Sequence, residues 1–332
     1  MSYFAAFDGG GTKTRCIICD EKGNVFADTK AGASNYQTVG IEASKAAIEE
    51  AFSNALQASE IKPEQISSAF LGLSGADEEY DLEIINKLCD LVFKGITFKV
   101  VNDSWICLRS GLKQKWGVVS ICGTGFNSGG RNPDGKEVIL RAAGYELGNF
   151  GGGDQLARMA LHHVFRADEG TGDKTLLQTM IPMILKEKSM TELYHKFRQS
   201  EEYFEECLDK IPPLVFRLAM QRDKVCQEIL IRMGQIIGEE ISGVILRLGM
   251  EDMKVPVVLG GSLYSAYETC PLLNDQLITA LHKTAPQAYL THPALPPVAG
   301  AYLSALDEAG INVSEPVYQN LQNRLDCGSI AI

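Results

Sequence analysis

The feature that constrains this chain most is an acidic, glycine-rich turn directly after a short apolar run near the N-terminus. Residues 3–7 (YFAAF) are long enough for a buried strand, and they lead into residues 8–14 (DGGGTKT). Successive glycines let backbone amides approach a ligand closely, and the turn also carries hydroxyls and one cation. This inventory suits the phosphates of a nucleotide.

The residues after the turn exclude two common phosphate-binding motifs. Residues 15–19 (RCIIC) are strand-like again, and residues 20–24 (DEKGN) are typical of a hairpin turn. The glycine turn therefore joins two antiparallel strands. A Walker-type loop or a Rossmann fingerprint would lead into a helix instead.

Length and composition limit the classes of function. At 332 residues the chain suits two domains, and a hydrophobic content of 45% suffices for ordinary cores. A formal net charge of -11 argues against a nucleic-acid or anionic-membrane partner, because both need a basic face. No apolar run is long enough to span a bilayer and no signal-peptide pattern precedes the first strand, so we expect a cytoplasmic protein.

The cysteines fit the same compartment. The chain has nine of them, scattered through strands and helices, as expected for reduced and mostly buried thiols. Cys16 and Cys19 form a C-x-x-C pattern, but residues three apart in a strand point to opposite faces. We therefore expect no shared metal or redox site there.

Strand-like runs that end in polar or glycine residues recur along the chain. Residues 98–101 (FKVV) run into Asn102 and Asp103, and such strand ends are where open α/β sheets bind ligands. Two further apolar runs end in glycine turns. They are residues 116–122 before Gly123, Thr124 and Gly125, and residues 255–259 before Gly260, Gly261 and Ser262.

The recurrence of strand, glycine turn and strand indicates a weak internal duplication with a boundary near residue 114. We predict helices over 42–58, 78–92, 154–167 and 223–248, and a helical stretch over 173–221 that breaks at Pro182 and at Pro212. The expected domains are residues 1–114 and 115–310, followed by a tail over 311–332. A last helix over about 297–309 is expected to pack back on the first domain.

Taken in order, these junctions resemble the superfamily of actin, heat-shock chaperone and sugar kinase ATPases, and within it the N-acetylglucosamine kinase group of the BadF/BadG-type ATPase family. The resemblance rests on residues 8–14 (DGGGTKT), 102–103 (ND), 122–125 (CGTG) and 259–262 (LGGS). It implies an α/β fold of two actin-like, ribonuclease H-like domains with a cleft between them. The domains would close around a sugar.

The resemblance implies an ATP-dependent kinase that uses Mg²⁺ and phosphorylates a small-molecule sugar. Asp103 would be the catalytic base, and Asp8 would hold the metal through water. The residues that would bind the nucleotide are Gly10, Gly11, Thr12, Lys13, Thr14, Gly123, Thr124, Gly125, Gly260, Gly261 and Ser262. We also expect a homodimer.

For the acceptor, the resemblance implies an aminosugar, with N-acetylglucosamine phosphorylated on its 6-hydroxyl, or a relative such as N-acetylmuramic acid or glucosamine. The residues that would bind it are Asn35, Asn102, Asn127, Glu146 and Asn149. Animal-type aminosugar kinases carry Asp-Glu-Gly-Ser after a glycine here, whereas Gly148 precedes Asn149. Either Glu146 replaces the missing acid or the acceptor differs.

Simpler interpretations remain for several of these residues. Asp8 and Asn35 are also typical of turns and caps, and Asp103 suits the N-cap of a following helix. Two other functions use the same fold. One is an ATPase activator of a CoA-ester reductase or dehydratase, which needs an iron–sulfur cluster, and the other is a sugar sensor with an added DNA-binding domain.

Overall fold

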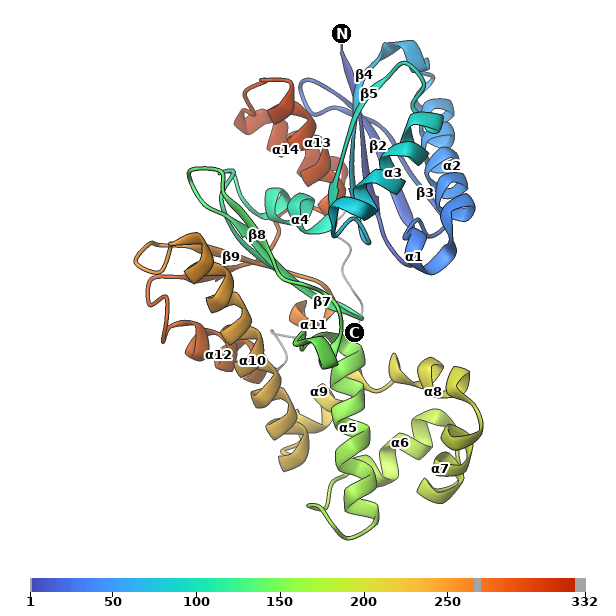
Figure 1. Cartoon of the computed structure of the whole chain (residues 1–332), viewed down its shortest axis with the longest axis vertical. Helices are drawn as coiled ribbons and strands as arrows, with labels where there is room; N and C mark the ends of the chain where they lie inside the picture. The colour runs from blue at the N-terminus through green and yellow to red at the C-terminus, as the bar shows by residue number, and fades with distance from the viewer. Residues whose placement is uncertain (1, 266–269, 326–332) are drawn as a thin grey trace. The chain divides into compact units, whose positions relative to one another are not determined.

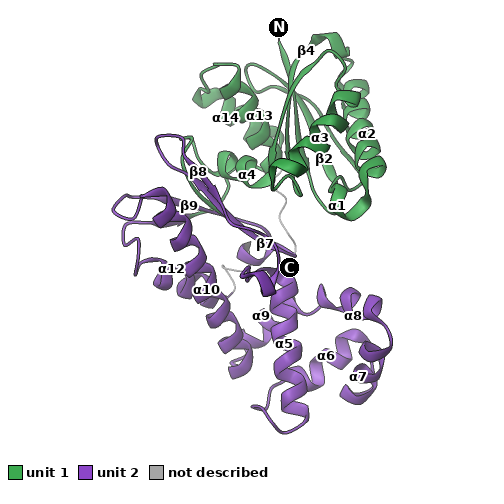
Figure 2. Cartoon of the chain, viewed as in Figure 1, with its two compact units in different colours: residues 1–119, 291–329 green, residues 120–290, 330–332 purple. Residues whose placement is uncertain are grey.

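The computed structural model describes residues 2–265 and 270–325, and the chain forms two compact units. Of the described residues, unit 1 contains those up to Val119 and those from Thr291 to Leu325, whereas unit 2 contains those from Ser120 to Leu290 (Figure 2). The division thus falls slightly later than residue 114. The segment after Thr291 lies in unit 1 because its helices pack on the sheet of that unit.

Unit 1 is built on a five-stranded sheet in the order β3-β2-β1-β4-β5 (Figure 1). β1 is antiparallel to β2 and parallel to β4, and β4 is parallel to β5. The antiparallel pair on either side of the first glycine turn is therefore confirmed. The strands are β1 (Tyr3–Gly9), β2 (Thr14–Asp20), β3 (Val25–Ala31), β4 (Ile66–Leu73) and β5 (Thr97–Asn102).

Each face of this sheet carries its own apolar core. On one face, buried residues of the sheet pack against Ile48, Phe52 and Leu88 of α2 and α3, and on the other they pack against the C-terminal helices. Cys16 belongs to the first core and Cys19 to the second, which confirms that the two thiols face opposite ways. The helical elements of unit 1 are α1 (Tyr36–Val39), α2 (Ile41–Ser59), η1 (Pro63–Gln65), α3 (Glu79–Val92), α4 (Asp103–Gly111), α13 (Pro297–Glu308) and α14 (Glu315–Arg324).

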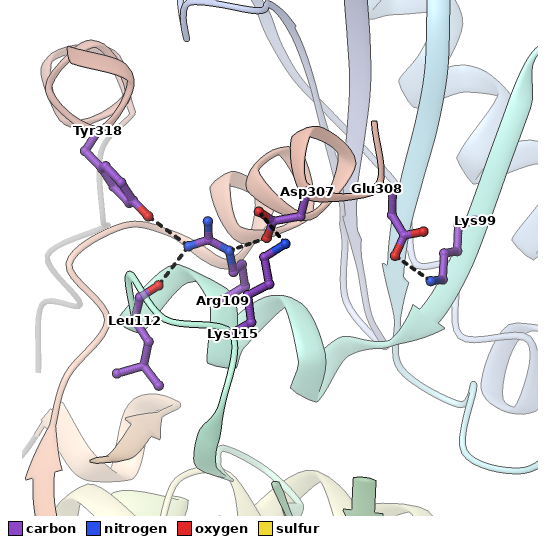
Figure 3. A network of polar contacts seen from close by, with 7 residues as sticks. All are labelled: Lys99, Arg109, Leu112, Lys115, Asp307, Glu308 and Tyr318. Atoms are coloured by element: carbon purple, nitrogen blue, oxygen red, sulfur yellow. Dashed lines mark hydrogen bonds and ion pairs between the residues drawn. The ribbon is translucent and has the colours of Figure 1, made fainter. Parts of the chain in front are cut away.

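A polar network ties α4 to the C-terminal helices (Figure 3). Arg109 donates from Nε to Asp307 at 2.7 Å, and from Nη1 to the Leu112 carbonyl at 2.8 Å and the Tyr318 hydroxyl at 2.9 Å. Lys115 lies 3.2 Å from the other oxygen of Asp307. The Arg109 and Asp307 side chains are only 7% and 17% exposed, so this ion pair is largely shielded from water.

The backbones of α4 and α13 approach each other closely at Gly300. A Cβ atom there would lie 1.9 Å from the Ile106 carbonyl oxygen and 2.8 Å from the Ser110 amide. Only glycine fits this crossing. The C-terminal helix therefore fixes α4, the helix that begins at Asp103.

Unit 2 contains a second five-stranded sheet, in the order β10-β9-β6-β7-β8. β7 and β8 form an antiparallel hairpin, closed by Asn132, whose side chain accepts from the amides of Asp134 at 3.1 Å and Lys136 at 2.9 Å. The strands are β6 (Gly117–Cys122), β7 (Phe126–Arg131), β8 (Glu137–Ile139), β9 (Pro256–Gly260) and β10 (Tyr289–Thr291).

In unit 2 the predicted helices over 154–167 and 223–248 are confirmed as α5 and α10. The predicted helical stretch over 173–221 forms four helices, with a break near Pro212 as predicted but none at Pro182. α6 continues through Pro182 and ends at Leu185, and its C-cap residue Lys186 adopts a left-handed φ of 61°. A proline removes one helical hydrogen bond, and here packing of the apolar helix outweighs that loss. The helical elements are η2 (Tyr145–Leu147), α5 (Gly152–Asp168), α6 (Leu177–Leu185), α7 (Met190–Gln199), α8 (Glu201–Leu208), α9 (Pro212–Met220), α10 (Lys224–Leu248), α11 (Ser262–Ser265) and α12 (Leu272–Leu281).

Among the residues that the structure describes, no helix combines the length and the apolar character needed to cross a bilayer.

Candidate active site

The first glycine turn is held rigidly between two loops of unit 1. The Gly10 amide donates to the Lys13 carbonyl at 3.0 Å, which closes the turn between β1 and β2. The Gly9 carbonyl accepts from the Ser74 amide at 2.9 Å, and the Gly10 carbonyl accepts from the Ser34 amide at 3.0 Å. A Cβ atom at Gly9 would lie 2.3 Å from the Ser34 hydroxyl, so only glycine fits there.

The outer part of this turn is presented to solvent. Gly11, Thr12 and Lys13 are exposed. The Gly10 amide, however, is already used within the turn, and Thr14 is fully buried with its hydroxyl donated to the Gly32 carbonyl at 2.8 Å. The phosphate contact of Thr14 stays a prediction, and its hydroxyl group is bonded here to Gly32, the residue after β3.

Three carboxylates gather at the carboxyl ends of the parallel strands. Asp8 near the end of β1 is paired with Gly72 of β4, and Leu73 of β4 is paired with Asn102 at the end of β5. Asp103 follows β5, and the Asp77 carboxylate is joined to the Asn102 side chain. The acids therefore meet at one edge of the sheet, as parallel strand ends must.

Asn102 joins two of these elements through its side chain. Its Oδ1 accepts from the Ser104 amide at 2.9 Å, which caps α4, and its Nδ2 donates to Asp77 Oδ1 at 2.6 Å. The role of Asn102 in sugar binding stays a prediction, and each end of its side chain makes one hydrogen bond within the protein. Asp103 is not the N-cap but the first residue of the helix.

The electrostatics of the cluster favour bound protons or cations. Burial, together with the charges of Asp8 and Asp77, raises the pKa of Asp103 to about 7. Burial also raises the pKa of Asp8 to about 6, an effect that the charges of Lys13 and Arg15 partly offset. Burial and its acidic neighbours raise the pKa of Asp77 as well. Asp77 escaped sequence analysis because it follows a short polar loop rather than the strand itself.

These acids fit a magnesium ion only in part. In the described ranges, no group of three or more histidine, cysteine, aspartate or glutamate side chains is arranged to hold a metal ion alone. Carboxylate oxygen is the ligand type that Mg²⁺ prefers, and Mg²⁺ commonly keeps several waters and phosphate oxygens. Asp8 therefore suits a magnesium ion whose remaining ligands are water and substrate.

The expected sugar loop lies beside the first glycine turn. Asn35 caps the short helix α1, because its Oδ1 accepts from the Gln37 amide at 3.0 Å. The capping interpretation of Asn35 is thus correct for its oxygen, while its Nδ2 has no partner recorded among the described residues. The hydroxyls of Ser34 and Ser74 are buried without a partner in the described part of the chain. This loop therefore offers unused polar groups.

In unit 2 the second glycine turn is locked onto the start of α5. The Gly123 amide donates to the Gly125 carbonyl at 3.0 Å, the Gly153 amide to the Gly123 carbonyl at 2.7 Å, and the Asp154 amide to the Thr124 carbonyl at 3.0 Å. Because these two amide groups at the start of α5 are bonded to the turn, they are not available to bind an anion. Thr124 and Gly125 are exposed.

The third junction lies against the end of β6. Gly261 has a φ of +100°, and a Cβ atom there would lie 2.4 Å from the Cys122 carbonyl oxygen. Gly260 ends β9, and Ser262 begins α11 with an exposed side chain. The turns at 123–125 and 260–262 are thus neighbours in unit 2.

The remaining expected sugar residues also lie in unit 2. The Oδ1 of Asn127 on β7 and the Nδ2 of Asn149 are buried without a partner among the described residues. Glu146, on η2, is exposed. Sequence analysis missed Glu240 on α10, whose Oε1 accepts from the Phe150 amide at 3.0 Å. Nothing local to residues 145–152 could have indicated this distant partner.

Known proteins resemble this chain over most of its length. The sequence is 31% identical over 319 residues to the N-acetyl-D-glucosamine kinase of Dictyostelium discoideum, covering 92% of this chain and 98% of that protein. It is 27% identical over 264 residues to the N-acetylmuramic acid/N-acetylglucosamine kinase of Clostridium acetobutylicum, covering 79% and 86%. Both relatives are therefore matched over most of their length.

The fold is also shared with solved structures. A candidate N-acetylglucosamine kinase from Chromobacterium violaceum superposes with a TM-score of 0.69 at 22% identity, covering 91% of this chain and 98% of that one. The predicted α/β class, with two actin-like domains, is confirmed by this likeness. The profile of the BadF/BadG/BcrA/BcrD ATPase family matches residues 7–305. The chain belongs to this ATPase family.

Proposed function

We propose that this protein is an ATP-dependent aminosugar kinase. The observation that carries the proposal is the position of the half-buried Asp103 directly after β5, where burial and the charges of Asp8 and Asp77 raise its pKa to about 7. A base with a pKa near neutrality is suited to accept the proton of a hydroxyl group. The names of the matched relatives support a sugar as the acceptor.

In the proposed reaction, Asp103 accepts the proton from the 6-hydroxyl of the sugar. The hydroxyl oxygen forms a bond to the γ-phosphorus of ATP while the bond from that phosphorus to the bridging oxygen of ADP breaks. Asp77 acts through Asn102, which caps α4 and so orients Asp103. Asp8 would hold Mg²⁺ through water, and this ion would neutralise phosphate charge when bound.

Each unit, taken by itself, carries groups suited to part of a nucleotide. We assign the phosphates to the exposed amides, hydroxyls and cation of the two glycine turns, and the adenosine to the third junction. Gly10 and Gly123 shape their turns, because their own amides are bonded within them. The residues in direct contact would be Gly11, Thr12, Lys13, Thr124, Gly125, Gly260, Gly261 and Ser262.

The acceptor is proposed to be N-acetylglucosamine or a close relative. Asn35 Nδ2, Asn127 Oδ1 and Asn149 Nδ2 lack partners within the described residues, and neutral amides match the mixed donors and acceptors of a sugar. Glu146 is exposed and can accept from two hydroxyls, in place of the acid absent after Gly148. We further propose that the enzyme requires Mg²⁺ and acts as a cytoplasmic homodimer.

A coupled assay of ATP consumption tests the proposal against a panel of hexoses and aminosugars in the presence of Mg²⁺. We expect N-acetylglucosamine, N-acetylmuramic acid or glucosamine to accelerate ATP consumption most. In the variant Glu146→Gln, KM for the sugar should increase far more than KM for ATP, by an amount equivalent to about 1.5 to 3 kcal/mol for one charge-assisted hydrogen bond. If no aminosugar accelerates ATP consumption, the kinase assignment gives way to the ATPase activator.

A further inference from the structure

A carboxyl group on α10 accepts one hydrogen bond from the glycine-rich segment of unit 2, through one of its two oxygens. Glu240 Oε1 accepts from the Phe150 amide at 3.0 Å across a separation of 90 residues. Its second oxygen, Oε2, is buried and has no partner among the residues that the structure describes. A buried carboxyl with one unsatisfied oxygen is costly when ionised and much less so when protonated.

The segment that Glu240 contacts is a strap, defined here as residues 149–154, which is fixed at its other end to the second glycine turn. The amides of Gly153 and Asp154 donate to that turn at 2.7 and 3.0 Å. A Cβ atom at Gly151 would lie 2.5 Å from the Phe126 ring, and one at Gly152 would lie 2.5 Å from the Thr124 carbonyl oxygen. The strap therefore lies flat on β7 and the turn.

Among the residues that the structure describes, no side chain of opposite charge shifts the pKa of Glu240. Burial raises its pKa to about 7, and the bond from the Phe150 amide offsets this only in part. The titratable groups that face it are Cys122 on β6 and Tyr264 on α11, and burial raises the pKa of both. Both therefore stay neutral near pH 7, so the proton on Glu240 is the variable charge of this region.

We propose that Glu240 is a positioning residue that holds the strap closed while its carboxyl group is protonated, and so fixes Asn149 and the second glycine turn for substrate. When the proton is lost, the carboxylate regains hydration by letting the segment at Phe150 open. The effect on substrate binding rests on the proposed kinase function. The opening of the strap when Glu240 loses its proton does not depend on that function.

Linkage fixes the direction and range of the effect. The closed form binds the proton with a pKa of about 7, whereas the open form returns to the ordinary value of 4.5. The closed state is therefore favoured most below pH 4.5, and its advantage is lost as pH rises toward 7. The opening constant increases about tenfold per pH unit in this range and levels off above it.

Amide hydrogen exchange of the full chain tests the inference without reference to activity. Between about pH 5.5 and pH 7.5, after correction for intrinsic exchange rates, protection of peptides covering 149–153 should fall roughly twentyfold in the wild type. In Glu240→Gln the amide oxygen can still accept from Phe150 but does not titrate, so protection should not change with pH. Glu239→Gln, at the exposed neighbouring position, should behave as the wild type.

Each comparison is made within one variant at two pH values, so an overall loss of stability in Glu240→Gln does not obscure it. The inference is overturned if wild-type protection is independent of pH, or if Glu240→Gln loses protection to the same extent. As a second readout, KM for the sugar should rise with pH in the wild type but not in Glu240→Gln. If no aminosugar is a substrate, the kinase proposal fails while hydrogen exchange still decides the role of Glu240.

Discussion

Asn102 donates its side-chain amide to Asp77 at 2.6 Å while its carbonyl oxygen caps α4 by accepting from the Ser104 amide at 2.9 Å. A single side chain thus links the loop after β4 to the first turn of the helix that carries Asp103. Asp77 and Asp8 also raise the pKa of Asp103. The link through Asn102 therefore also holds the charge of Asp77 near Asp103. The position and the acidity of Asp103 therefore have a common origin.

The pH dependence of the reaction should report this coupling. A base must be ionised to act, so kcat/KM for the sugar should rise as pH increases through about 7, the raised pKa of Asp103. Asp77→Asn keeps an oxygen that can accept from Asn102 but removes a negative charge. We expect the rising limb of the kcat/KM profile to shift to lower pH in this variant.

The matched control is Asp90→Asn, which removes an exposed charge from α3 in the same unit. Its pH profile should coincide with that of the wild type. An unshifted limb in Asp77→Asn, with the control also unshifted, would mean that Asp77 does not act on Asp103.

The Arg109–Asp307 pair should contribute strongly to the stability of unit 1. The Asp307 side chain is only 17% exposed, and in Arg109→Ala it keeps Lys115 as an ion-pair partner but loses Arg109. Because a shielded carboxylate then lacks its main partner, we expect a loss of about 3 kcal/mol in the free energy of unfolding. Lys99→Ala removes the neighbouring pair with Glu308, whose side chains are 51% and 56% exposed (Figure 3). That variant should lose less than about 1 kcal/mol.

Urea denaturation of the three proteins measures the difference. The double variant Arg109→Met/Asp307→Leu leaves no buried charge unpaired and should recover much of the lost stability. Equal losses for Arg109→Ala and Lys99→Ala would show that the shielding of the first pair is unimportant.

Gly300 should be intolerant of even a methyl group. Gly300→Ala would place a Cβ atom 1.9 Å from the Ile106 carbonyl oxygen, so α13 must move away from α4. We expect a loss of about 1 to 3 kcal/mol in stability and a lower kcat, because α4 carries Asp103. Gly243→Ala, in α10 with open space around the added atom, should instead stabilise the protein by up to about 1 kcal/mol. Thermal unfolding and steady-state kinetics of both variants decide this.

Sequence reasoning succeeded where chemistry follows directly from a strand end. The prediction that Asp8 and Asp103 lie at strand ends is confirmed, because an apolar run that stops at an acid leaves little freedom for the position of that acid, and parallel strands bring such ends together. Their roles in the reaction stay predictions. The glycine turns were likewise readable from the residues alone. The bond from the Thr14 hydroxyl group to Gly32 could not be predicted in this way, because it depends on how β2 aligns with β3.

The interactions that escaped prediction join segments far apart in the chain. Glu240 lies on an amphipathic helix and bonds to Phe150 across 90 residues, and Arg109 reaches Asp307 and Tyr318 across more than twice that separation. Hydrophobic periodicity shows which helix face is buried but does not reveal the partner of a polar group on it. Asp77 and its partner Asn102 are closer in the sequence. The role of Asp77 was still not predicted, because a short loop separates it from the end of β4.

The measurement that tests the central claim most directly is formation of sugar phosphate from ATP and N-acetylglucosamine, followed by phosphorus NMR, in the wild type and in Asp103→Asn. We expect the wild type to produce ADP and sugar phosphate in equal amounts. In the variant, turnover should fall at least about a hundredfold, the scale expected for loss of a general base, with binding of ATP and sugar nearly intact. Retention of most of kcat by Asp103→Asn, or ATP consumption by the wild type without sugar phosphate, would contradict the account.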